Sequence, residues 1–178
     1  MKIKIIHITA LALCLAGCAS PEVSTTAPPV GNQSELQRLD LSKYDVVTVM
    51  AFDVQPGSGV DPIVGQKFAG DVFGRLKHDF GNLFTEVRFG EPEGKANELV
   101  VTGNLRAYAN ADQVGIILQR VSKVDGDLIL RDAATKQVIF SGDIKMHMFE
   151  GTVESMQLAG AASVANTVAR GRGWQPAK

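Results

Sequence analysis

The sequence predicts an α+β domain of two layers, in which two helices pack on one face of a mostly antiparallel sheet. The first observation is the order of the elements, which runs strand, helix, several strands and a final helix. The second is the alternation of apolar and polar side chains in several strands, because alternation is typical of sheets with one buried face. The composition, with 45% hydrophobic and 21% charged residues in a chain of 178, fits one ordinary globular domain.

The first strand and the first helix are predicted between residues 44 and 80. Residues 44–52 are apolar on both alternating faces and rich in β-branched side chains, which indicates a buried central strand. Asp61 then provides a helix N-cap, and Pro62 occupies the first helical position, where a missing amide proton costs nothing. An amphipathic stripe continues until Gly81. The stripe is formed by Val64, Phe68, Ala69, Val72, Phe73, Leu76 and Phe80.

Three further strands are predicted after this helix. A short one covers residues 84–89, and a half-buried one covers residues 99–108, where apolar and polar side chains alternate. Residues 114–124 form the third. Asp125-Gly126 is a dipeptide typical of a hairpin turn, and it would lead into another strand at residues 127–132.

A long strand and a second helix complete the domain. Residues 138–148 alternate between an apolar and a polar face, after a turn at residues 132–136. Residues 153–170 predict a helix that Gly171 and Gly173 end. Small side chains recur at every fourth position of this helix and permit close contact with the sheet. They are Ala161, Ala165 and Ala169.

Two helices on one face leave the other face of the predicted sheet polar and open. Its side chains include Arg106, Tyr108, Asp143, Lys145 and His147, which together form a candidate binding surface. Antiparallel sheets also commonly leave one face in solvent for no functional reason, so a purely structural interpretation stays open.

Residues 1–17 have the layout of a signal peptide. Two lysines precede an apolar run that is too short to span a bilayer. The run ends in Leu15-Ala16-Gly17-Cys18, which resembles the lipobox of bacterial lipoproteins, where lipid is attached to the cysteine and cleavage occurs just before it. The resemblance implies several acyl chains on Cys18, enough to hold the protein on a membrane. Ala19, in place of aspartate, implies by the same resemblance transfer to the outer membrane.

The rest of the chain divides into three parts. Residues 18–42, which begin with the lipidated cysteine, have few apolar side chains and predict a flexible tether. Residues 43–173 form a single α+β domain, and residues 174–178 form a C-terminal tail. Cleavage would remove Cys14 and leave one cysteine, so folding would rest on packing without disulfides.

Three segments carry a resemblance to a known family. They are Tyr44 to Phe52, Leu83 to Val87, and the hairpin from Leu128 to Val138. They resemble a bacterial domain of unknown function that occurs mostly in small lipoproteins, although Lys136 stands where glycine is usual in the turn. The likeness covers residues 43–173. More distantly, the order of elements is similar to that of accessory lipoprotein domains in curli secretion and penicillin-binding-protein activation. The resemblance implies no known activity.

Charge and motifs argue against several functions. The 18 basic and 19 acidic residues are nearly balanced, which makes a nucleic-acid binder unexpected. A phosphate-binding Gly-x-x-x-x-Gly-Lys loop, a Gly-x-Ser-x-Gly elbow and a His-Glu-x-x-His zinc motif are all missing from the sequence. Ser58 lies in a glycine loop, and a serine nucleophile needs a nearby base. His78 lies near a helix end, where a solvated role is the simpler interpretation.

Two short motifs contain residue types that bind metals. Met146-His147-Met148 contains soft copper ligands, but adjacent side chains of a strand point to opposite faces, so the methionines are expected in the core. Asp125-Gly126-Asp127 lacks the further spaced oxygen ligands of a calcium loop. We therefore expect no metal, no cofactor and no enzymatic activity.

These observations favour a lipid-anchored protein on the periplasmic face of the outer membrane. Its folded domain is expected to contact another protein of the envelope rather than to catalyse a reaction. The alternative is a small-ligand or glycan-binding lipoprotein that uses the open polar face. An enzyme is a third interpretation, with no residues assigned to it.

Overall fold

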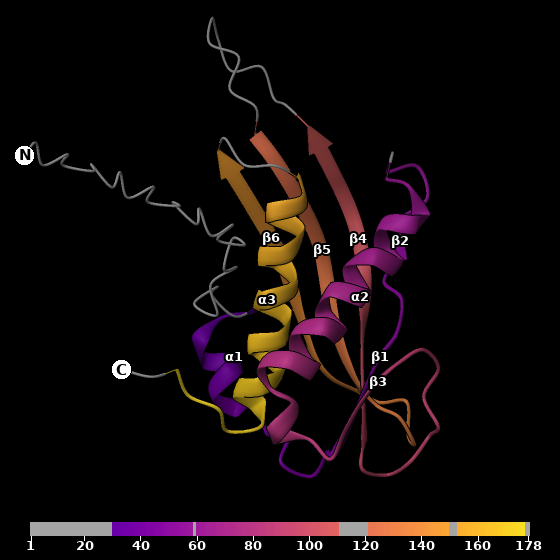
Figure 1. Ribbon diagram of the computed structural model, residues 1–178, viewed down its shortest axis with the longest axis vertical. Helices are drawn as coiled ribbons and strands as arrows, with labels where there is room; N and C mark the ends of the chain where they lie inside the picture. Colours follow the sequence, from indigo (N-terminus) through magenta and orange to yellow (C-terminus); the bar gives the residue numbers. More distant parts are fainter. Residues whose placement is uncertain (1–29, 59, 111–120, 150–152, 177–178) are drawn as a thin grey trace, which may run out of the picture.

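The computed structural model describes residues 30–58, 60–110, 121–149 and 153–176. Within these ranges the chain forms a two-layer α+β domain, as the sequence predicts. Two long helices, α2 (Pro62–Asp79) and α3 (Val153–Gly171), lie against one face of a sheet (Figure 1). A short helix, α1 (Gln33–Arg38), packs against α3.

The sheet has six strands in the order β3-β1-β4-β5-β6, and β2 pairs with β4 beyond the end of β1. Three pairings are parallel, namely β1 with β3, β1 with β4, and β2 with β4. β5 pairs antiparallel with both β4 and β6. The strands are β1 (Val46–Val49), β2 (Asp53–Val54), β3 (Glu86–Phe89), β4 (Glu98–Asn110), β5 (Val121–Asp132) and β6 (Val138–Phe149).

The sheet is therefore mixed, and the prediction of a mostly antiparallel sheet is wrong for its first half. The reason is the position of α2 between β1 and β3. A helix that runs back along the sheet returns the chain to the end where β1 began, so the next strand must run parallel to β1. The loop after β3 then crosses to the other side of β1, where β4 also starts in the same direction.

The predicted central strand at residues 44–52 is shorter than expected. It ends at Val49, and the chain then bends before β2 begins. Phe52 lies in this bend, fully inside the core, and its ring meets the ring of Phe68 edge-on with centroids 5.0 Å apart. The bend thus places an aromatic side chain between α2 and the sheet.

Asp125-Gly126 does not form the predicted hairpin turn. β5 runs through both residues without a break, and Gly126 lies opposite Leu105 of β4. A Cβ at Gly126 would lie 2.4 Å from the backbone oxygen of Asn104, and the ladder shifts register just after Leu105. The glycine therefore allows a close approach of two strands beside a bulge, which the dipeptide pattern cannot distinguish from a turn. Of the predicted strand at 114–124, the first seven residues lie outside the described residues.

Both predicted helices are confirmed, and they cover the apolar core. The Asp61 side chain accepts a hydrogen bond from the Ile63 amide at 3.0 Å and caps α2. Ala161, Ala165 and Ala169 of α3 are fully buried, so this small-residue stripe brings α3 close to its neighbours. The largest buried side chains of the layer between helices and sheet are Phe68, Leu76, Leu99, Leu105, Leu128, Leu130, Ile144 and Met156.

The folded domain begins earlier than residue 43, so the predicted tether is too long at its C-terminal end. α1 starts at a capping box in which the Asn32 side chain accepts from the backbone of α1. The Val30 amide donates to Thr167 Oγ1 of α3 at 2.6 Å, and Leu41 is fully buried. A few apolar residues are enough to hold a mostly polar segment against the domain. The average composition of residues 18–42 does not reveal them.

The end of α3 is held by a clamp that also extends the domain into the predicted tail. The Arg172 guanidinium donates to the backbone oxygens of Leu41 at 3.3 Å and Leu83 at 2.8 Å, joining the segments before β1 and before β3. The Trp174 ring then meets Phe80 edge-on, with centroids 5.0 Å apart. The packed part of the chain therefore reaches at least residue 174.

Replacing Gly103 with alanine should destabilise the domain. A Cβ there would lie 1.8 Å from the backbone oxygen of Asp127 and 2.6 Å from the Phe52 ring, so the strands would have to separate. We expect a loss of about 1–3 kcal/mol in unfolding free energy, measured by urea denaturation. Gly70→Ala in α2 is the matched control, because nothing lies within 4 Å of its added Cβ. It should stabilise the protein by about 0.5–1 kcal/mol, and equal effects of the two changes would contradict this packing.

Candidate functional site

The face of the sheet opposite the helices, here called the outer face, is closed at one end. Thr48 of β1 and Glu98 of β4 point away from the helices but are fully buried. The loop after β3 covers them, and its Glu93 and Lys95 amides donate to the Glu98 carboxylate at 3.1 and 3.2 Å. The Thr48 hydroxyl donates to the same carboxylate at 2.7 Å. The expectation of a wholly open outer face is therefore wrong over β1 and the start of β4.

Glu98 is a buried carboxylate with a full set of donors. Burial by itself raises the pKa of this group, but the hydrogen bond from Thr48 and those from the covering loop outweigh burial and lower the pKa. Ionised Glu98 therefore stabilises the fold above its ordinary pKa of 4.5, and this stabilisation is lost as the pH falls through the lower value in the folded protein.

Asp132 ends β5 beside this buried carboxylate and organises the turn to β6. Its Oδ1 accepts from the amides of Ala134 and Thr135 at 3.1 and 2.9 Å. Its Oδ2 accepts from the Tyr44 hydroxyl at 2.9 Å and the Lys43 ammonium at 3.1 Å. The Thr135 amide is the main cause that holds the pKa of Asp132 well below its usual range. The predicted turn at residues 132–136 is thereby confirmed and joined to the start of β1.

Three of the five residues of the candidate binding surface lie together on the outer face as an ion-paired network. Arg106 pairs with Asp127 and, at 3.3 Å, with Asp143. Lys145 pairs with Asp143 at 2.8 Å. Each cation in this network already has a carboxylate partner, so the network offers a ligand little uncompensated charge.

The other two residues of that surface are Tyr108 of β4 and His147 of β6. Both occupy strands, in register with Val124 and Lys123 of β5 respectively, as the alternating pattern predicts. Their side chains, like those of the neighbouring Met146 and Met148, lie outside the described residues.

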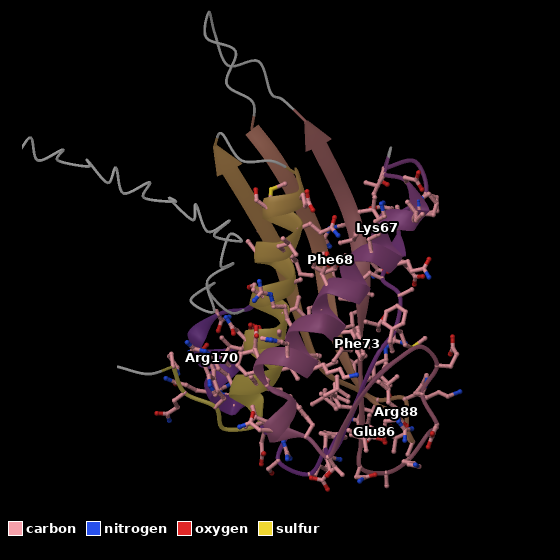
Figure 2. The ribbon with its side chains drawn as sticks, viewed as in Figure 1. Lys67, Phe68, Phe73, Glu86, Arg88 and Arg170 are labelled. Carbon is pink, nitrogen blue, oxygen red and sulfur yellow. The ribbon has the colours of Figure 1, made fainter. Side chains whose placement is uncertain are left out.

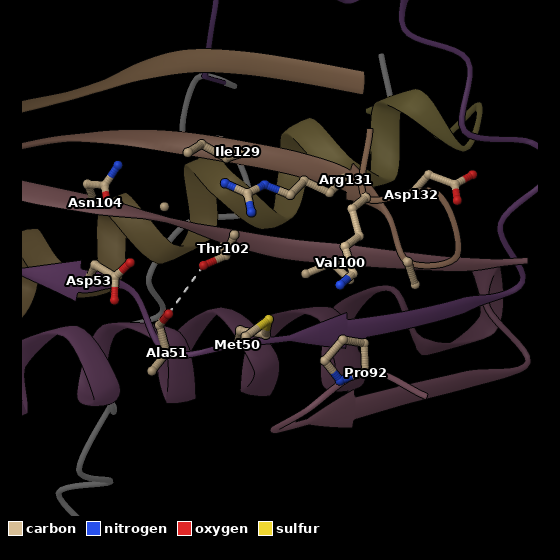
Figure 3. Close-up of a pocket in the computed structure, with 13 residues that line it drawn as sticks. Met50, Ala51, Asp53, Pro92, Val100, Thr102, Asn104, Ile129, Arg131 and Asp132 are labelled. Carbon is tan, nitrogen blue, oxygen red and sulfur yellow. Dashed lines mark hydrogen bonds between the residues drawn. The ribbon is translucent and has the colours of Figure 1, made fainter. Parts of the chain in front are cut away.

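A pocket of about 320 Å³ lies on the outer face over β4 and β5, between the closed end and the ion-paired network (Figure 3). Residues from the bend after β1, the loop after β3 and the turn after β5 complete its walls. The apolar lining consists of Met50, Ala51, Pro92, Val100, Ile129 and Ala133. The polar lining includes Asp53, Thr102, Asn104, Arg131 and Lys136.

The charged side chains of Arg131, Lys136 and Asp53 form no ion pair with any other residue that the structure describes. They differ in this from the Arg106 network and from Arg88, which pairs with Glu86 beside it on β3 (Figure 2). Sequence reasoning assigned none of these pocket residues to the site. Its one signal was the lysine at a turn position where glycine is usual, and the backbone there has a φ of 60°, in the left-handed region.

The described residues offer no assembled catalytic centre. His78 is exposed and contacts Asp79 at 2.8 Å, near the last turn of α2. Ser58 precedes the first turn of the same helix, so about 24 Å of helix separates them. Within the described ranges, no group of three or more His, Cys, Asp or Glu side chains could hold a metal ion. Among the same residues, no helix has the length and apolar character needed to cross a membrane.

No family model matches the chain, and no curated protein matches it in sequence. Among solved structures, the fold is similar to that of a PelC variant from Paraburkholderia phytofirmans, crystallised as a dodecamer, with a TM-score of 0.53 and 18% identity. The match covers 72% of this chain and 90% of that one. At this identity the likeness establishes a shared fold and nothing about activity.

Two more distant structures also match. One is that of a neuraminyllactose-binding hemagglutinin homologue from Helicobacter pylori, with a TM-score of 0.41, 12% identity and coverage of 79% of this chain and 85% of that one. The other is a candidate lipoprotein from Caulobacter crescentus, with a TM-score of 0.42, 12% identity and coverage of 81% and 99%. At these scores neither bears on the argument.

Thr48→Val should destabilise the protein in a pH-dependent way. It removes a donor from buried Glu98, which should cost about 1–3 kcal/mol of unfolding free energy at pH 7. Because that donor lowers the pKa of Glu98, the difference from wild type should shrink as the pH falls below 4.5. Urea denaturation at pH 7 and at lower pH measures it.

Thr102→Val on β4 is the matched control for this prediction. The Thr102 hydroxyl donates to an uncharged group, the backbone oxygen of Ala51, at 3.2 Å. Its loss should cost the same at both pH values. If the effect of Thr48→Val were equally independent of pH, Glu98 would not be ionised in the folded protein.

Proposed function

We propose that this chain is a lipid-anchored lipoprotein of the bacterial envelope, attached through Cys18 to the outer membrane and facing the periplasm. Its folded domain acts without catalysis, by contacting another component of the envelope. The observation that carries the proposal is the run Leu15-Ala16-Gly17-Cys18 at the end of a short apolar segment with a basic start. A thiol at this position can carry the diacylglyceryl thioether, and two or more acyl chains give stable anchoring.

The geometry of the domain is compatible with an anchor close to the membrane. Val30, twelve residues after Cys18, is docked on α3 by its hydrogen bond to Thr167. Twelve residues can span at most about 40 Å when fully extended. The point at which an anchored chain joins the domain, at Val30, would therefore stay within that distance of the bilayer.

A non-catalytic role is supported by the state of the charged groups. The buried carboxylates Glu98 and Asp132 are saturated by structural donors, and the Arg106 network is internally paired. Groups that are already satisfied have little capacity to take part in proton transfer or nucleophilic attack. We therefore favour a binding role over an enzymatic one.

The partner is proposed to be a protein of the envelope, and a second copy of this chain is the first partner to test. The PelC structure with which the chain shares a fold is a dodecamer. In this chain β6 is an edge strand of the sheet, and edge strands carry backbone groups that can pair with another chain.

The second candidate function is the binding of a small ligand or glycan by the outer face. The pocket over β4 and β5 favours it, because its lining combines apolar side chains with three charged side chains that form no ion pair among the described residues. The pocket is a better candidate for such a site than the ion-paired Arg106 network.

Cys18→Ser should release the protein from the membrane or block its processing. Wild-type protein expressed in its native host should sediment with the outer membrane after cell lysis and density fractionation. The variant lacks the thiol for lipid attachment, so it should be lost from that fraction almost completely.

Cys14→Ser is the matched control, since Cys14 lies in the segment that cleavage removes. It should leave fractionation unchanged. Sedimentation of the Cys18→Ser variant with the outer membrane to the same extent as wild type would contradict lipid anchoring at this residue.

Chemical crosslinking in intact cells should trap the anchored domain in a discrete adduct. We expect one product of defined mass, containing either a second copy of the chain or one other envelope protein, and identified by mass spectrometry of its peptides. The Cys18→Ser variant should lose this adduct, because it is no longer held beside its partner. If the anchored protein gave no adduct with either, the proposed partner contact would be wrong.

A further inference from the structure

The pocket on the outer face differs from its surroundings in its charge balance. Arg106 and Lys145 nearby are both neutralised by carboxylates. Arg131 and Lys136 in the pocket pair with no carboxylate among the described residues, and Asp53 pairs with no cation there. The fold therefore leaves two positive groups and one negative group available to a ligand.

These charges lie toward opposite ends of the pocket. Along β4, Arg131 is in register with Val100, and Asp53 is in register with Asn104. Four residues of a strand span about 13 Å along the strand direction, and β2 and β5 lie on opposite sides of β4, about 10 Å apart, so the two backbone positions are about 16 Å from each other. Figure 3 shows the Arg131 side chain running along the strands toward Thr102, in the direction of Asp53. The gap that remains suits an extended molecule of two or three amino-acid residues.

The space between the charged ends has the lining that a peptide needs. Met50, Val100 and Ile129 provide apolar contact for small side chains, while Thr102 and Asn104 provide hydrogen-bonding groups. An unpaired guanidinium favours a carboxylate over a neutral sugar, because its planar donors match the two carboxylate oxygens. The charge pattern therefore favours a peptide over an uncharged glycan.

Lys136 provides an independent observation at the same pocket. Its φ of 60° lies in the left-handed region, where any residue with a Cβ is strained and glycine is not. The chain nevertheless has a lysine there, and the lysine lines the pocket. Strain that persists at one residue of a pocket is a reason to look for a role of its side chain.

We propose that this pocket binds short peptides with free ends, holding the C-terminal carboxylate on Arg131 and Lys136 and the amino group at Asp53. The proposal gives a ligand class to the second candidate function and rests on it. It does not depend on the lipid anchor.

Trialanine is the probe that tests this assignment, titrated by calorimetry into the full chain purified in detergent. Saturable binding is expected. Trialanine amide, which lacks the carboxylate, and N-acetyl-trialanine, which lacks the amino group, should each bind about tenfold more weakly or worse, because each loses one charge-assisted contact.

Variants should match these losses group by group. Arg131→Gln should weaken trialanine binding about tenfold and abolish the preference for the acid over the amide. Asp53→Asn should also weaken trialanine binding about tenfold, and it should abolish the preference for trialanine over its N-acetylated form. The control variant is Lys67→Gln. Lys67 is an exposed residue of α2, which packs on the opposite face of the sheet, so its replacement should leave the affinity for trialanine unchanged.

Lys136→Gly separates binding from folding. Glycine relieves the left-handed strain, so this variant should melt at a higher temperature than wild type while it binds trialanine more weakly. A structural role alone would give the rise in melting temperature without the loss of affinity.

Two results would overturn the assignment: no saturable binding of trialanine at millimolar concentrations, or equal binding of trialanine, its amide and its acetylated form. Neither result would bear on the membrane anchor, which fractionation of the Cys18→Ser variant decides separately. Failure of the peptide site and failure of the anchored lipoprotein are therefore distinguishable.

Discussion

Two buried carboxylates at one end of the sheet impose the constraint on which the rest of the structure depends. The backbone amide of Ala133, the residue after Asp132, donates to the backbone oxygen of Glu98 at 3.0 Å, so the two acidic residues lie on neighbouring strands. A buried carboxylate is costly unless donors surround it. Here the donors come from β1, from the segment before it, from the loop after β3 and from the turn after β5. Satisfying both groups joins three segments that are far apart in the sequence, namely residues 43–48, the loop that leads into β4, and the turn after β5.

The same constraint shapes the pocket. The loop held by Glu98 carries Pro92, and the turn held by Asp132 carries Lys136, so both walls are positioned by saturated acidic groups. Both walls of the pocket are thus fixed by hydrogen bonds to buried carboxylates, while the charges of Arg131 and Asp53 form no ion pair within the described part of the chain. Asp132, whose carboxylate has a full set of hydrogen-bond donors, is next in sequence to Arg131, whose guanidinium forms no ion pair among the described residues. We therefore assign a structural role to the first group and a binding role to the second.

The fold could be predicted from the sequence where local physics decides, and not where long-range geometry does. The cap at Asp61 and the alanine stripe of α3 are local signals, and both helices form as predicted. The parallel strands β1, β3 and β4 depend on where the chain returns after α2, which alternation does not encode. An Asp-Gly pair is typical of a hairpin turn, but a glycine is also favoured at a bulge between strands, where Gly126 lies. The pocket escaped prediction because Asp53 and Arg131 line one pocket only when β2 and β5 flank β4.

The central claim is that a domain with this fold is held at the bacterial envelope by lipid on Cys18. The most direct test is the intact mass of the native protein extracted from membranes, with peptide mapping of its N-terminus. We predict a chain that begins at Cys18 and carries the added mass of a diacylglyceryl group, normally with a third acyl chain on the freed amine. A chain of unmodified mass, or one that begins at any other residue, would contradict the account.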